Sequence, residues 1–160
     1  MNLGASASSC FGAVIYSALL FLTGCSAESI RLSDGTTVTW SAWEGRPIVL
    51  NYWAEWCAPC RLEIPELNAV YREGLSTGTV VLGVNYDGIT GEELVRLSKK
   101  MNIEFPVLAV DPIGHWDYRP PDVLPATVIV GPEGNVIDVL VGPQTRESIL
   151  VVIGKGTGES

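Results

Sequence analysis

The stretch of sequence that decides the fold is residues 51–65, NYWAEWCAPCRLEIP. It begins inside an apolar, β-prone run, residues 48–53 (IVLNYW), of the kind expected for a buried central strand. From residue 58 to residue 73 the apolar side chains recur every three or four positions, which predicts a helix. Cys57 and Cys60 therefore lie where a strand passes into a helix.

This position gives the two cysteines different roles. Cys57 is predicted at the amino end of the helix, where free backbone N–H groups and the helix dipole favour a thiolate. The thiolate is the form of cysteine that attacks a disulfide. Cys60 lies one helical turn further on, so it can attack the mixed disulfide and release the partner. Pro59 is tolerated because the first turn of a helix does not need its N–H.

Outside this segment, short strands and helices alternate. A hairpin is expected over residues 30–40, with its turn at Ser33-Asp34-Gly35. Gly74 is expected to end the first helix. Later elements are expected as strands at 79–86, 105–110, 127–130 and 136–141 and as helices at 91–101 and 145–153.

The order of these elements predicts an α/β fold. Parallel strands joined by helices, then closed by an antiparallel hairpin, give a central mixed sheet flanked by helices on both faces. The hairpin at residues 30–40 is an extra N-terminal addition to this sheet. Residues 115–124 are expected to be irregular, because Pro120 and Pro121 cannot continue a helix.

Residues 51–65 resemble the active-site segment of the TlpA/ResA-like branch of exported thioredoxins, which reads roughly N-F-W-A-x-W-C-x-P-C-x-x-E-x-P. Residues 124–127 (LPAT) resemble the cis-proline loop of the same family. The likeness extends from Leu32 to about Ile153. It implies a thioredoxin fold and thiol:disulfide oxidoreductase activity, with no cofactor and no metal.

The resemblance also implies roles for residues around the cysteines. Pro125 is expected to follow a cis peptide bond and to pack against the cysteine pair. A cis X-Pro bond is uncommon in proteins and usually has a structural or functional role. The backbone of Leu124 is then able to pair with an extended partner chain by strand addition. Trp56 is interpreted as a partner-facing side chain and Trp53 as a core side chain, although packing alone would explain either.

Glu63 is the third candidate catalytic residue after the two cysteines. It follows Cys60 by three positions, so it lies one turn along and near the same helix face. In TlpA/ResA-like proteins a glutamate here lies close to the cysteines and helps manage their protons, whereas the alternative is a solvated helix glutamate. Asn51 occupies the position of a buried aspartate in cytoplasmic thioredoxins, and asparagine cannot titrate.

The N-terminus predicts export. Residues 11–22 are apolar and uncharged but too short to cross a bilayer, which suits a signal peptide. Leu22-Thr23-Gly24-Cys25 resembles the bacterial lipoprotein box. Residues 1–24 are therefore interpreted as a lipoprotein-type signal peptide, 25–29 as the lipidated Cys25 and a tether, and 30–160 as the thioredoxin-like domain.

The charge of residues 1–10 departs from the pattern of a lipoprotein signal peptide, whereas the positions of the cysteines support it. Residues 1–10 contain no Lys or Arg, so an uncleaved hydrophobic anchor or a buried helix remains an alternative. Cleavage would remove Cys10 and acylation would block Cys25, which leaves Cys57 and Cys60 as the one pair of thiols. The expected location is the periplasmic side of the cell envelope, with the protein held to the membrane by its lipid.

The chain is acidic, with a net charge of −8, and every charged side chain lies at or after Glu28. Phosphate contacts require clustered Lys and Arg, so a nucleic-acid partner is not expected. The expected partners are protein thiols and disulfides, together with a membrane thiol protein that donates electrons.

The residues between the cysteines bear on the direction of exchange. Strong oxidants of this fold carry a histidine there, which stabilises the reduced form. Here the pair is Ala58-Pro59, close to the Gly-Pro of reducing thioredoxins. We therefore expect a reductant of protein disulfides, and the resemblance implies cytochrome c or copper-site maturation as its setting.

Two other functions remain open from the sequence. The first is a copper-binding or metal-delivery lipoprotein that uses the same cysteine pair, because thiolates suit Cu(I). Against it, Met101 and His115 are the only methionine and histidine after the predicted signal peptide. The second is a structural lipoprotein with an inert disulfide.

Overall fold

The computed structural model describes residues 28–157. The predicted signal peptide and the Cys25 lipidation site lie outside the described residues, so both stay predictions. Among residues 28–157, no helix combines the length and the apolar character needed to cross a membrane.

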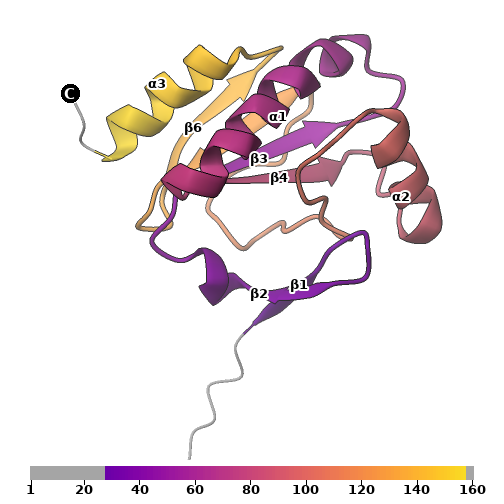
Figure 1. Ribbon diagram of the computed structural model, residues 1–160, viewed down its shortest axis with the longest axis horizontal. Coiled ribbons are helices and arrows are strands. Elements are labelled where there is room, and N and C mark those ends of the chain that lie inside the picture. Colours follow the sequence, from indigo (N-terminus) through magenta and orange to yellow (C-terminus); the bar gives the residue numbers. More distant parts are fainter. Residues whose placement is uncertain (1–27, 158–160) are drawn as a thin grey trace, which may run out of the picture.

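A four-stranded mixed sheet forms the centre of the molecule, in the order β4-β3-β5-β6 (Figure 1). Strands β3 (Ile48–Trp53) and β4 (Val80–Asn85) run parallel. Strand β5 (Ala126–Val130) is antiparallel to β3, and β6 (Val136–Val141) is antiparallel to β5. The predicted mixed sheet is therefore confirmed.

Strands β3 and β4 are buried along their whole length, as their continuous apolar sequences predict. Successive side chains point to opposite faces of the sheet. Val49 joins the core on one face, with Leu67 and Ile149, whereas Leu50 joins the core on the other face. This alternation decides which residues of β3 approach the cysteines.

Two helices cover the first face. Helix α1 (Ala58–Thr77) follows β3, and helix α3 (Arg146–Thr157) packs beside it (Figure 1). The expected end of α1 at Gly74 was wrong: the helix continues to Thr77 and ends at Gly78, whose φ of 93° is left-handed. Gly74 instead lies against the backbone of Thr79, so its missing side chain permits a close approach.

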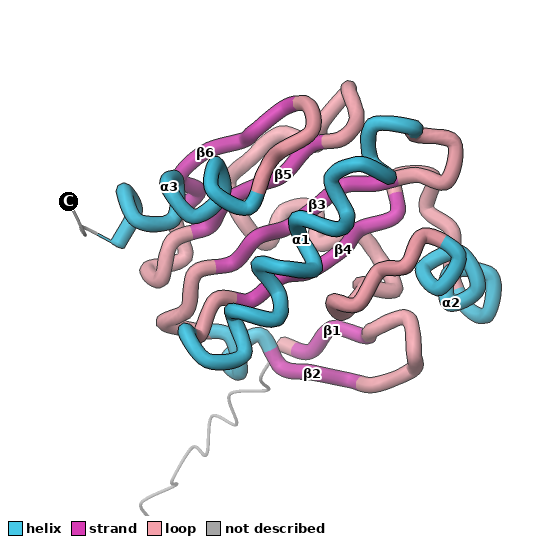
Figure 2. The backbone as a smooth tube through the Cα atoms, turned by 45° about the horizontal axis from the view of Figure 1, so that its top comes forward, coloured by secondary structure: helices cyan, strands magenta, loops and turns pink. Residues whose placement is uncertain are grey.

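The second face carries no long helix in the described part of the chain, which corrects the expectation of helices on both faces. Helix α2 (Gly91–Lys100) lies beside the edge strand β4 (Figure 2), and its Leu94 and Leu97 pack with Trp53 and Ile64 of the first face. The second face is covered by a hairpin of β1 (Ser29–Arg31) and β2 (Thr37–Thr39), the 3-10 turn Trp40–Trp43 and the loop at 109–125.

The sequence explains this cover. The hairpin turns at the predicted Ser33-Asp34-Gly35, and Gly35 has a φ of 89°. In the loop, Pro120 and Pro121 prevent a helix, so Trp116 and Tyr118 pack singly on the sheet. The expected strand at 105–110 is reduced to single bridges at Val107 and Leu108, because Pro106 has no N–H to donate to a ladder.

Candidate active site

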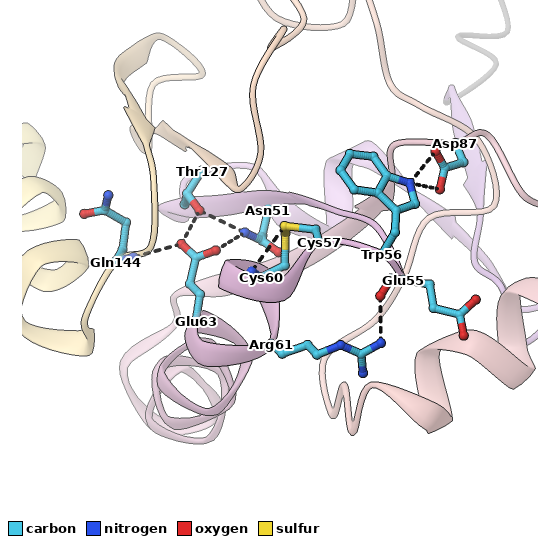
Figure 3. Close-up of a disulfide and its surroundings, with 10 residues drawn as sticks. All are labelled: Asn51, Glu55, Trp56, Cys57, Cys60, Arg61, Glu63, Asp87, Thr127 and Gln144. Carbon is cyan, nitrogen blue, oxygen red and sulfur yellow. Dashed lines mark hydrogen bonds between the residues drawn. A yellow bond between two sulfur atoms is a disulfide. The ribbon is translucent and has the colours of Figure 1, made fainter.

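Cys57 and Cys60 form a disulfide at the point where β3 gives way to α1 (Figure 3). Cys57 is the N-cap of α1, and its sulfur accepts a 3.2 Å hydrogen bond from the backbone N–H of Cys60. An N-cap sulfur next to free N–H groups is well placed to carry negative charge. The geometry therefore favours a thiolate at Cys57 after reduction.

The two cysteines differ slightly in exposure. Cys57 is 3% exposed and Cys60 is 1% exposed. Trp56, Ala58 and Pro59 around Cys57 are all exposed. Both sulfurs are therefore nearly closed to solvent, and the exposed surface next to the pair consists of these three residues.

Glu63 faces the sheet and is only 1% exposed, so it is not a solvated helix glutamate. Its Oε2 accepts a 2.9 Å hydrogen bond from Asn51 Nδ2, and its Oε1 accepts one of 3.1 Å from Thr127 Oγ1. The backbone N–H of Gln144 donates a third, at 3.3 Å. Three separate segments of the chain therefore converge on one buried carboxyl group.

Burial raises the pKa of Glu63 to about 7, from an ordinary value of 4.5. Desolvation penalises the charged form, and the hydrogen bonds from Thr127, Asn51 and Gln144 lower the pKa only in part. A carboxyl group with this pKa changes its charge near neutral pH. It is therefore suited to accept or return a proton under physiological conditions.

Asn51 lies between Glu63 and the cysteines (Figure 3). Besides Glu63, its Nδ2 donates a 3.0 Å hydrogen bond to Thr127 Oγ1. The sheet register explains this contact, because Asn51 of β3 is paired with Thr127 of β5. An amide cannot titrate, so Glu63 is the ionisable member of this network.

Trp56 is 66% exposed and stands at the rim of the site. Its indole N–H lies 3.1 Å from both carboxylate oxygens of Asp87 (Figure 3). The ring of Tyr86 meets it edge to face, with centroids 6.4 Å apart. Trp56 is thus an exposed aromatic side chain held in a fixed orientation, whereas Trp53 is fully buried, as predicted.

The Leu124–Pro125 peptide bond is cis, as the resemblance implied. The side chain of Leu124 packs against the cluster that contains both cysteines. The carbonyl of Pro125 accepts a 2.9 Å hydrogen bond from Gly142, which joins the loop to the start of the region after β6. Within residues 28–157, the N–H and C=O of Leu124 make no backbone hydrogen bond.

A network of hydroxyl groups, which sequence reasoning missed, fixes the loop that leads to Pro125. Tyr52 Oη donates to Asp111 Oδ1 at 2.8 Å and lies 2.6 Å from Tyr118 Oη. Tyr52 belongs to β3, whereas the other two residues belong to the loop at 109–125. Burial raises the pKa of Tyr52, so its hydroxyl stays protonated and hydrogen-bonded.

Three other residues of the site were also missed. Thr127 had a signal, because it is the one polar residue of the strand ATVIV. Gln144 contributes a backbone N–H, which no side-chain pattern reveals. Asp87 pairs with Trp56 across 31 positions of sequence. Within residues 28–157, no three His, Cys, Asp or Glu side chains gather in a way that could hold a metal ion.

Comparisons with known proteins agree with this geometry. Residues 23–139 match the model of the AhpC/TSA family. A curated relative, the thiol-disulfide oxidoreductase ResA of Bacillus subtilis (strain 168), is 30% identical over 131 residues, which is 79% of this chain and 71% of the relative. In four curated ResA relatives the chain spans 71%, 66%, 60% and 68% of their length, which is about two thirds.

Solved structures show the same fold. A thiol:disulfide interchange protein of the thioredoxin family from Chlorobium tepidum TLS superposes with a TM-score of 0.69 at 24% identity, over 81% of this chain and 92% of that one. The exposed lipoprotein thioredoxin of Streptococcus pneumoniae strain TIGR4 has a TM-score of 0.64 at 25% identity, over 80% and 98%. The chain therefore belongs to the AhpC/TSA family and, within it, to the ResA-like thiol:disulfide oxidoreductases with a thioredoxin fold.

Proposed function

We propose that this protein is a membrane-anchored reductant of protein disulfides on the periplasmic side of the cell envelope, and that it acts through Cys57 and Cys60. One observation carries the proposal: the cysteine pair lies at the amino end of α1, beside a buried carboxyl group with a pKa of about 7. This arrangement supplies a nucleophile and a proton acceptor within one site.

The proposed reaction has two exchange steps. The Cys57 thiolate attacks one sulfur of the partner disulfide, forms a mixed disulfide and releases the other partner sulfur, which takes up a proton. Cys60 then loses its proton and attacks the Cys57 sulfur, which frees the second partner thiol. The partner gains two electrons and two protons, and the chain is left with the Cys57–Cys60 disulfide. A membrane thiol protein must then reduce it again.

Glu63 is proposed to serve the second step. Cys60 is closed to solvent, so its proton needs a local acceptor. The buried Glu63 carboxylate is one turn away on α1 and titrates near neutral pH. Glu63→Gln should therefore change the pH dependence of Cys57 alkylation, and an unchanged profile would remove Glu63 from the mechanism.

Trp56, Leu124 and Pro125 are proposed to bind the partner. Trp56 offers an exposed, fixed indole ring, and Leu124 offers a free backbone N–H and C=O beside the cysteines. An extended partner chain can pair with that backbone in the manner of an added strand. The packing of the Leu124 side chain against the cluster that contains both cysteines supports this role.

The reducing direction rests on Ala58-Pro59 between the cysteines. Equilibration with glutathione buffers measures it directly. We expect a reduction potential close to the value of about −270 mV that reducing thioredoxins show. A potential near the oxidant end, about −120 mV, would overturn the reducing assignment.

The membrane anchor rests on the sequence around Cys25. It is supported by the similarity to a pneumococcal lipoprotein thioredoxin. Growth with a radioactive fatty acid tests it: wild-type protein should carry the label and Cys25→Ala should not. Absence of label on the wild type, or equal label on both proteins, would contradict the proposal that Cys25 carries a lipid.

Apocytochrome c thiols and copper-site cysteines are the substrates proposed from the family resemblance. Cys60→Ser should hold such a partner on Cys57 as a mixed disulfide, and Cys57→Ser/Cys60→Ser is the matched control. Insulin reduction by the wild type gives an independent measure of exchange. Stoichiometric Cu(I) binding without insulin reduction would instead favour the copper-binding alternative.

A further inference from the structure

The side-chain oxygen of Asn51 is buried and has no hydrogen-bond partner among the described residues. The orientation of the amide is nevertheless fixed. Its Nδ2 donates to both Glu63 Oε2 and Thr127 Oγ1, at 2.9 and 3.0 Å. The Thr127 hydroxyl already donates its hydrogen to Glu63 Oε1, so a turned amide would place its oxygen against the lone pairs of Thr127 Oγ1 and, while Glu63 is ionised, against a carboxylate oxygen. The unpaired oxygen is therefore a real feature of the site.

The location of this oxygen indicates a partner. The side chain of Asn51 lies between Glu63 and the cysteine pair, with the nitrogen on the Glu63 side (Figure 3). The oxygen occupies the other arm of the amide, turned away from Glu63 toward the side on which Figure 3 draws the cysteine pair. A disulfide has no S–H and cannot donate to it. Reduction creates two thiols, and a thiol is a hydrogen-bond donor.

We propose that Asn51 Oδ1 accepts a hydrogen bond from the S–H of Cys60 in the reduced protein, and that this bond favours the dithiol over the disulfide. Asn51 is then a positioning residue that holds the Cys60 sulfur and the Glu63 carboxyl on either side of one amide. The proposal rests on the proposed function, because it assigns the reduced state of the same pair.

Cys60 rather than Cys57 is the donor for two reasons. Cys57 is the N-cap of α1, where the thiolate is favoured and carries no proton. Cys60 is the more deeply buried of the two, so its thiol has no water to bond with. A buried polar group without a partner is costly, and the Asn51–Cys60 bond satisfies two such groups at once.

The bond also fits the chemistry of exchange. Reduction of the disulfide adds two electrons; one proton binds to Cys60, while Cys57 remains a thiolate. When Cys60 attacks the mixed disulfide, its S–H bond breaks and the proton leaves to Glu63, its proposed acceptor. Asn51 cannot take that proton; it keeps the sulfur in place while the proton departs.

The reduction potential of Asn51→Leu tests the proposal, because leucine approximates the shape of asparagine without the acceptor. The full chain is equilibrated with dithiothreitol buffers at pH 5, where Glu63 keeps its proton and its charge does not change. We expect the equilibrium constant for reduction to fall about tenfold, which makes the potential about 30 mV more negative. An unchanged or less negative potential would overturn the assignment.

Asn68→Leu is the matched control. Asn68 is a buried asparagine of α1 whose amide bonds the backbone of Asn102 and Glu104, away from the cysteines. Its replacement should lower stability but leave the potential unchanged. A shift equal to that of Asn51→Leu would assign the effect to general loss of packing and overturn the proposal.

A second measurement covers the case in which Asn51→Leu does not fold. The infrared S–H stretch of Cys60 is isolated by subtracting the spectrum of Cys57→Ser/Cys60→Ser from that of Cys57→Ser. A hydrogen-bonded thiol absorbs at lower frequency than a free thiol in an apolar solvent, and we expect that lower frequency. A band at the free-thiol position would contradict the proposal.

These measurements are independent of any protein substrate. If the wild type fails to reduce protein disulfides but the tenfold shift is present, the proposed function falls and the assignment of Asn51 stands. If the wild type reduces protein disulfides and the potential does not move, the assignment falls and the proposed function stands.

Discussion

Asn51 donates a 2.9 Å hydrogen bond to the carboxyl group of Glu63, and both side chains are about 1% exposed. The contact joins β3 to α1, the helix that begins at the cysteine pair. Because the donor is neutral, it offsets only part of the cost of burying the carboxylate. This incomplete compensation leaves Glu63 with a pKa of about 7.

The first prediction concerns stability and pH. Glu63 has a pKa of about 7 in the folded protein and an ordinary value of 4.5, so between these values the folded state binds more protons than the unfolded state. The free energy of unfolding should therefore fall as pH rises from about 4.5 to about 7, by on the order of 3 kcal/mol from this group. Glu63→Gln should lack this decline. Urea unfolding of both proteins across that range measures it.

An exposed glutamate provides the control for that series. Glu92→Gln, on the open face of α2, should keep the wild-type slope of unfolding free energy against pH. Equal slopes in the wild type and Glu63→Gln would mean that the buried carboxyl does not titrate in this range.

The second prediction concerns Trp56. Its ring is exposed and makes no core contact, so Trp56→Ala should change the free energy of unfolding by less than about 1 kcal/mol. A fixed aromatic side chain is a typical binding hot spot, so kcat/KM toward a protein disulfide should fall about tenfold. The rate with a small-molecule disulfide should not change, because that substrate does not reach the ring. An equal loss for both substrates would place Trp56 in the chemical step instead.

The third prediction separates the members of the Tyr52 network. Tyr118→Phe removes one hydroxyl and leaves the bond from Tyr52 to Asp111, so it should cost about 1 kcal/mol. Tyr52→Phe removes the partner of both Tyr118 and Asp111 and should cost about twice as much. Chemical denaturation of the two variants compares them. A larger loss for Tyr118→Phe would show that Tyr52 is not the centre of the network.

The fourth prediction concerns Gly74. Alanine is normally better than glycine inside a helix, by about 1 kcal/mol. Here the new Cβ would overlap the backbone carbonyl of Thr79, which cannot move easily. Gly74→Ala should therefore destabilise the protein by about 2 kcal/mol or more. Leu75→Ala, at an exposed neighbouring position, is the control and should have little effect on the midpoint of thermal unfolding.

Local patterns were sufficient for the elements that carry the cysteines. The apolar run of β3 and the helical spacing after it placed Cys57 and Cys60 correctly, because both signals depend on neighbours in sequence. The spacing from Cys60 to Glu63 also placed the carboxyl on the inner side of α1. What the spacing could not show was whether that glutamate was buried.

The rest of the site depends on contacts between distant segments. Thr127 and Gln144 reach Glu63 across 64 and 81 positions of sequence, and no local pattern encodes such a meeting. The predicted end of α1 was wrong for a related reason. Gly74 is required by a close tertiary contact with Thr79, whereas the glycine with the left-handed backbone that ends the helix is Gly78. The loop at 109–125 covers the second face of the sheet through the packing of Trp116 and Tyr118, which is also a contact between distant segments.

Two consecutive residues of β3 belong to different hydrogen-bond networks on opposite faces of the sheet. Asn51 points toward α1 and the sulfur chemistry, whereas Tyr52 points the opposite way and anchors the loop that precedes Pro125. The alternation of the strand thus separates the hydrogen bonds that hold the loop from the network around the Glu63 carboxyl group on the opposite face. The corresponding vulnerability is that insertion of a single residue into β3 would exchange the two sides and disable both.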